Sequence, residues 1–98
     1  MIYVVATLKI RAETREKFLA GARAVIAGTV KEKGCVSYEL HQSILDPERY
    51  VFVERWEERS NLDAHFHAPH FKVWRGVGAD CIIDRKIEII HADKIEKM

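Results

Sequence analysis

Apolar residues alternate with polar ones, or run together over a few positions, in four separate stretches of the chain. These stretches are Ile2–Ile10, Cys35–Ser43, Tyr50–Glu57 and Cys81–Ile90. Their content of β-branched and aromatic residues predicts four β-strands. The first stretch is apolar at consecutive positions in its first half, which indicates a central strand or one covered on both faces.

Two stretches between these strands carry apolar residues at helical spacing instead. In the first, Thr14 is a plausible N-cap and Gly34 a C-terminal stop. Its apolar stripe consists of Phe18, Leu19, Ala22, Val25, Ile26 and Thr29. The second stretch opens at Ser60–Asp63, which resembles a capping box with aspartate in place of glutamate. Pro69 interrupts it, and either kinks this helix or begins a new one.

The predicted order is therefore β-α-β-β-α-β within one domain, residues 1–98, whose last residues 93–98 form a frayed tail. This is the ferredoxin-like α+β pattern: a four-stranded antiparallel sheet with two helices on one face. The third strand is nevertheless apolar on both faces, with Val51 and Val53 alternating with Phe52 and Trp56. A bare apolar face predicts a homodimer that packs sheet to sheet.

The amino-acid composition argues against several classes of function. The 16 basic and 15 acidic residues are interspersed and give a net charge of +1, which offers no electrostatic surface for nucleic acid. We expect no membrane contact and a cytoplasmic protein, because no leader precedes the first strand and no apolar stretch could span a bilayer. Cys35 and Cys81 are expected to be buried thiols in a reducing compartment.

His65 is the first candidate for chemistry. It shares a helix face with Leu62 and Phe66, at spacings of three and four residues. A histidine on this sheet-facing stripe is either a packing residue or lines a cavity in which it can move a proton.

Alternation along the third strand gives a second set of candidates. Trp56 shares a face with Glu54 and Phe52, so the tryptophan is either a core residue or the wall of a pocket for a flat substrate. A carboxylate at position 54 is costly unless it finds a partner or a wet pocket. His41 and Glu39 share a face of the second strand, and hairpin pairing is expected to bring them opposite Glu54.

The three histidines of the segment His65–His70 raise the question of a metal. Residues two apart, such as His65 and His67, lie on different sides of a helix, and no acidic residue stands at a familiar ligand spacing. We therefore expect no metal site, with His67 solvated and His70 at the rim of a pocket. Dinucleotide and phosphate-binding loops are also absent, so no built-in dinucleotide or phosphate site is expected.

Three motifs, SYELHQ (37–42), VFVERWE (51–57) and HFHAPHF (65–71), resemble the antibiotic biosynthesis monooxygenase family. The similarity is greatest to small bacterial quinol monooxygenases of that family and covers nearly the whole chain. The resemblance implies a dimeric ferredoxin-like α+β barrel that oxygenates a quinol or related aromatic with molecular oxygen and no cofactor. It places Trp56 and Phe71, with Phe52 and His70, around the substrate. In this reading His65 accepts the proton, and Glu54 or His41 orients or polarises the substrate.

Other branches of the family keep alternatives open. The antibiotic-pathway branch carries polar residues where this chain has Phe52 and Leu62. The haem-degrading branch needs an Asn, a Trp and a His where this chain has Thr7, His65 and Arg75, so haem degradation is not expected. A third branch isomerises a phosphorylated sugar, for which Arg55 and Arg75 are candidate ligands. The alternatives are thus an acid–base isomerase or a non-catalytic dimeric module that binds a small molecule.

Overall fold

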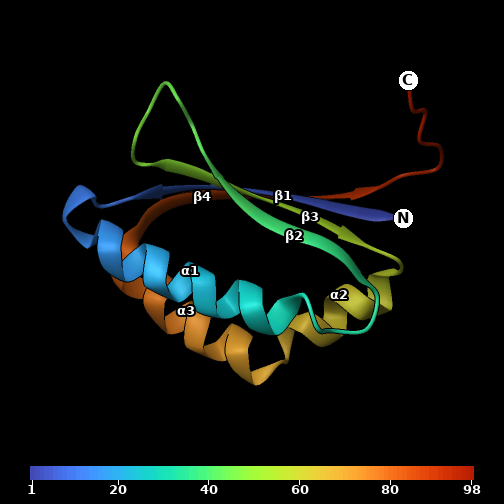
Figure 1. Cartoon of the computed structure of the whole chain (residues 1–98), viewed down its shortest axis with the longest axis horizontal. Helices are drawn as coiled ribbons and strands as arrows, with labels where there is room; N and C mark the ends of the chain where they lie inside the picture. Colours follow the sequence, from blue (N-terminus) through green and yellow to red (C-terminus); the bar gives the residue numbers. More distant parts are fainter.

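The computed structural model describes all 98 residues as one α+β domain (Figure 1). Its elements are β1 (Ile2–Ile10), a short 3-10 helix η1 (Ala12–Thr14), α1 (Arg15–Thr29), β2 (Cys35–Gln42), β3 (Arg49–Trp56), α2 (Arg59–Phe66), α3 (Pro69–Cys81) and β4 (Ile82–His91). Every paired strand is antiparallel, and the sheet order is β2-β3-β1-β4. The ferredoxin-like prediction is confirmed, and so is the central position of β1.

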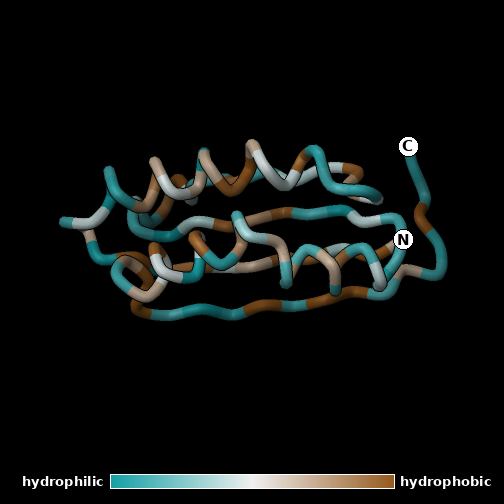
Figure 2. The backbone as a smooth tube through the Cα atoms, turned by 90° about the horizontal axis from the view of Figure 1, so that it is seen from below, coloured by the Kyte–Doolittle hydropathy of each residue, from teal (hydrophilic) through white to brown (hydrophobic).

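The helices all lie on one face of the sheet, and α1 packs beside α3 (Figure 1). Apolar and polar segments alternate along both helices, as the helix-side view in Figure 2 shows. Alternate residues of β1, from Ile2 to Ile10, are buried beneath them, and the α1 stripe buries Phe18, Ala22 and Val25 completely. The core therefore forms between the inner face of the sheet and the helix layer.

The structure resolves one open point at the helix ends and corrects two predictions. Pro69 begins a new helix, so the second helical stretch is two helices, because proline fits the first turn, where its missing N–H is not needed. The capping box of α2 uses Glu58 and Asn61 rather than Ser60 and Asp63. Cys81 ends α3, so β4 begins one residue later than the pattern predicted.

The two cysteines are both free, but only one matches the expectation of a buried thiol. Cys81 is fully buried, whereas Cys35 is partly exposed at the start of β2. Burial raises the pKa of the Cys35 thiol to about 11, with help from the charges of Glu32 and Glu54. The Cys35 side chain is therefore a neutral thiol at pH 7.

The face of the sheet away from the helices carries apolar side chains that nothing in this chain covers. Pairing places Val5 beside Val53, and Tyr3 beside Ile90, on this face. Val53 and Ile90 are 36% and 45% exposed. None of the helices combines the length and the apolar character that crossing a membrane requires.

Candidate active site

A cavity of about 300 Å³ lies between the inner face of the sheet and the helices α2 and α3. Eleven of its sixteen lining residues are hydrophobic, so polar groups inside it are poorly solvated. The polar side chains that line it are Glu54, His65, Tyr38, Arg75 and Arg85. The first three are buried and the two arginines are exposed, which gives the cavity a dry inner end and a basic mouth.

Glu54 faces the cavity because it alternates with the buried residues of β3. Only 6% of it is exposed, and the indole Nε1–H of Trp56 donates a hydrogen bond to its Oε1 over 3.0 Å. Burial raises the pKa of Glu54 to about 7, opposed by the Trp56 hydrogen bond and supported by the negative charge of Glu32. Near neutral pH this carboxyl group therefore exists in both protonation states.

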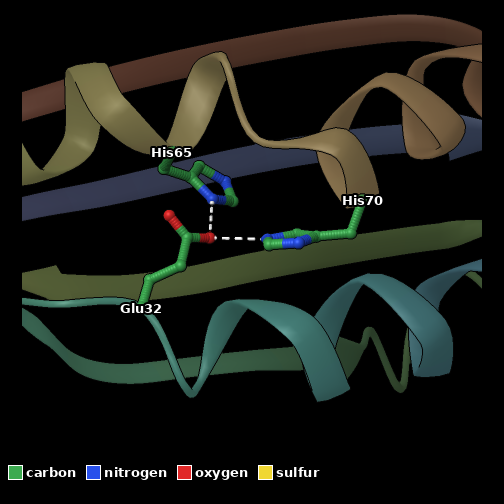
Figure 3. A group of neighbouring side chains, drawn as sticks. All are labelled: Glu32, His65 and His70. Atoms are coloured by element: carbon green, nitrogen blue, oxygen red, sulfur yellow. Dashed lines mark hydrogen bonds and ion pairs between the residues drawn. The ribbon is translucent and has the colours of Figure 1, made fainter.

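His65 is held by a carboxylate from another part of the chain. Glu32 lies in the turn between α1 and β2, and its Oε2 is 2.7 Å from both His65 Nδ1 and His70 Nε2 (Figure 3). A carboxylate oxygen only accepts hydrogen bonds, so we assign a proton to each of these two nitrogens. We call Glu32, His65 and His70 the carboxylate–histidine cluster.

The other ring nitrogen of His65, Nε2, is buried and has no hydrogen-bond partner. Burial lowers the pKa of His65, although the hydrogen bond and charge of Glu32 act in the opposite direction. A neutral ring that donates through Nδ1 leaves a free lone pair on Nε2. The cluster therefore holds a fixed, unsolvated proton acceptor on a histidine that lines the cavity.

Aromatic rings hold the His65 ring in place. The ring centroids of Phe71, Trp56 and Tyr38 lie 4.7, 5.0 and 5.3 Å from that of His65. Burial, together with the charges of Glu54 and Glu32, raises the pKa of the Tyr38 phenol, so Tyr38 stays neutral. The inner end of the cavity thus holds a neutral imidazole, a neutral phenol and a carboxyl group that titrates near pH 7.

The carboxylate–histidine cluster is also a candidate binding site for a metal cation. One ligand atom from each of Glu32, His65 and His70 lies within 4.8 Å of the others, whereas His67 is exposed and takes no part. Ligand atoms around a tetrahedral zinc ion are roughly 3.3 Å apart. The 2.7 Å contacts are hydrogen-bond lengths, and a cation would have to displace both protons. The sequence argument considered only local spacing and missed Glu32.

Only some of the four predicted substrate-binding residues line the cavity. Phe52 and Phe71 do, as predicted. Trp56 is fully buried behind Glu54 and His65, and supports these side chains instead of forming the cavity wall. His70 lies outside the cavity and contacts Glu32.

The predicted position of His41 is wrong. The register pairs His41 with Val51 and Glu39 with Val53, whereas Tyr38 lies opposite Glu54. His41 and Glu39 therefore lie on the outer face of the sheet, where His41 Nε2 contacts Glu39 Oε1 at 3.2 Å in an exposed pair. A shift of one residue in register exchanges the two faces of a strand.

Four residues of the site were not anticipated: Glu32, Tyr38, Trp74 and Arg85. Arg75 was considered only as a ligand for a phosphorylated substrate. Glu32 lies in a connection 33 residues from His65, where no periodic pattern reaches. Its position is a consequence of the tertiary fold alone.

Fold and site together define a small α+β protein with one apolar cavity and a histidine–carboxylate pair suited to proton transfer. The family model described as "Antibiotic biosynthesis monooxygenase" matches residues 1–77. The chain therefore belongs to this family, as its motifs indicated.

Individual relatives are similar at moderate identity. An uncharacterized protein of Synechocystis sp., sll1783, is 31% identical over 71% of this chain, and the match spans about half (48%) of that protein's length. "Probable quinol monooxygenase YgiN" of Escherichia coli K12 is 24% identical over 92% of this chain and 96% of its own. The solved structure of Rv0793 from Mycobacterium tuberculosis superimposes with a TM-score of 0.88 at 29% identity, covering 98% of both chains.

Proposed function

We propose that this protein is a cofactor-independent monooxygenase that oxidises a quinol, or a related electron-rich aromatic, with molecular oxygen. One observation carries the proposal: His65 lines an apolar cavity, its Nδ1 is held by Glu32, and its buried Nε2 has no hydrogen-bond partner. The name of the relative YgiN favours the same substrate class. Glu54 supplies a second titratable group in the same cavity.

The reaction begins with proton transfer. His65 Nε2 accepts the hydroxyl proton of the bound quinol, and Glu32 stabilises the imidazolium that forms. The resulting phenolate transfers one electron to oxygen, and the semiquinone and superoxide combine to form a carbon–oxygen bond. Apolar walls favour these steps because they exclude the water that would solvate the phenolate and deactivate it.

The second half of the reaction breaks the oxygen–oxygen bond. The His65 imidazolium and protonated Glu54 each give one proton to the outer peroxide oxygen, which leaves as water, and the Glu54 carboxylate takes up the proton that the ring carbon loses. The quinol and oxygen thus yield a hydroxyquinone and one water molecule, and the quinol supplies all four electrons. Metal and flavin have no step in this sequence.

Oxygen uptake tests the proposal. Metal-free protein, prepared with a chelator, should consume oxygen with a panel of one- and two-ring hydroquinones faster than spontaneous oxidation does. Labelled dioxygen should place one heavy atom in the hydroxyquinone and the other in water. Uptake at the spontaneous rate for the whole panel would contradict the proposal, and turnover of a substrate without oxygen would favour an acid–base isomerase.

A homodimer through the outer face of the sheet is the second part of the proposal. Its support is the uncovered apolar surface around Val53 and Ile90. We expect Val53→Lys to convert a 22.8 kDa dimer, twice 11.4 kDa, to monomer in sedimentation equilibrium. Val73→Lys is the matched control, since Val73 is 66% exposed on α3 on the helix side. A dimer that survives the first substitution but not the second would place the interface on the helices.

A further inference from the structure

Two arginines at the mouth of the cavity have no acidic partner. Arg75 and Arg85 both line the cavity, and neither forms an ion pair with any carboxylate of the chain. Asp80 pairs with Lys17, and Asp84 lies beside Lys9 on the outer face of the sheet. The basic mouth therefore has no internal counter-charge.

The two side chains come from opposite walls. Arg75 extends from α3, where one guanidinium nitrogen donates to the carbonyl oxygen of Phe66 over 2.9 Å and the group lies 5.0 Å from the centre of the Phe71 ring. This anchoring fixes one edge of the guanidinium and leaves its other donors free. Arg85 lies on β4 opposite Leu8, which itself lines the cavity, and its guanidinium makes no hydrogen bond within the chain.

From this arrangement we infer that the substrate is an aromatic hydroxy acid: an apolar ring of one or two fused units with a hydroxyl group at one end and a carboxylate at the other. The hydroxyl reaches His65 and Glu54 at the inner end, and the carboxylate meets Arg75 and Arg85 at the mouth. A volume of about 300 Å³ is at the small end of ligand cavities and fits one or two rings. Planar, multi-donor guanidinium groups suit a carboxylate. The inference rests on the proposed function for the inner end of the cavity only.

Binding of two matched ligands tests the inference without any turnover. Calorimetry at about pH 6.5 and low ionic strength compares 6-hydroxy-2-naphthoate, which carries the carboxylate, with 2-naphthol, which lacks it. We expect the naphthoate to bind on the order of tenfold more tightly. The preference should shrink as salt is added, because exposed charges are screened.

Arginine variants test whether Arg75 and Arg85 cause the tighter binding of the naphthoate. Arg85→Gln, and more fully Arg75→Gln with Arg85→Gln, should abolish the preference while 2-naphthol binds as before. Lys72→Gln is the charge-matched control on α3, since Lys72 is exposed and does not line the cavity. Equal affinity for the two ligands, absence of binding by either, or a preference that survives the double substitution would overturn the inference. If the wild-type protein shows this binding pattern but no oxygen uptake, the oxygenase proposal is refuted and the inference about the carboxylate is not.

Discussion

Replacement of His65 by glutamine is expected to lower kcat/KM for quinol-dependent oxygen uptake by about 10²–10⁴-fold, the usual contribution of a positioned general base. Glutamine can still donate to Glu32 and fill much of the space, but its amide cannot accept the quinol proton. The loss should appear in kcat as well as in kcat/KM, because proton transfer belongs to the reaction and not to binding.

Two comparisons make this result specific. His41→Gln changes an exposed histidine on the outer face of the sheet and should leave turnover unchanged. Near-ultraviolet circular dichroism should show that the aromatic surroundings of residue 65 are retained, since His65 packs against Tyr38, Trp56 and Phe71. Normal uptake by a folded His65→Gln protein would remove His65 from the mechanism.

The second large effect concerns stability. Glu54→Gln is expected to raise the free energy of unfolding at about pH 8.5 by about 3 kcal/mol, and to change it little at about pH 4. The pKa of Glu54 is about 7 in the folded protein, against 4.5 as its ordinary value. A shift of about 2.5 pKa units corresponds to about 3 kcal/mol at 1.36 kcal/mol per unit.

The sign of this stability difference follows from the protonation state of Glu54 that the folded protein favours. Because the folded-state pKa is raised, the contribution of Glu54 to stability is fully present below about pH 4.5 and is lost as pH rises through about 7. Glutamine has no charge to bury and can accept the Trp56 hydrogen bond through its amide oxygen. Urea unfolding of both proteins at equal protomer concentration, from about pH 4 to 8.5, measures the difference. A difference independent of pH would contradict the buried, titrating carboxyl group.

The fold could be predicted from the sequence because its signals are local and repeated. The β-branched and aromatic residues of β1 and β3 and the Phe18–Thr29 stripe of α1 each indicated one element, and the stripe also indicated the buried face of α1. The order of elements then left the ferredoxin-like sheet as the arrangement to expect. Proline at position 69 was compatible with two local structures, and in the structure it begins α3, which packs against α1.

The site was predictable only where a side chain follows the periodicity of its element. His65 lies on the apolar stripe of α2 and Glu54 on the inner face of β3, and both line the cavity. The assignment of His41 depended on strand register, which the hairpin sequence does not specify. Glu32 and Arg85 depended on long-range contacts between a turn, a helix and an edge strand, which no local pattern encodes.

In the proposed mechanism, Glu32 keeps the proton of neutral His65 on Nδ1 and leaves Nε2 as a free acceptor. Nitrogen-15 NMR of histidine-labelled protein at about pH 7 measures this directly, with Glu32→Gln used to assign the His65 resonances. We expect a protonated Nδ1 and an unprotonated Nε2 for His65. A ring protonated on Nε2, whether alone or together with Nδ1, would leave no lone pair for the substrate proton and would exclude His65 as the proton acceptor.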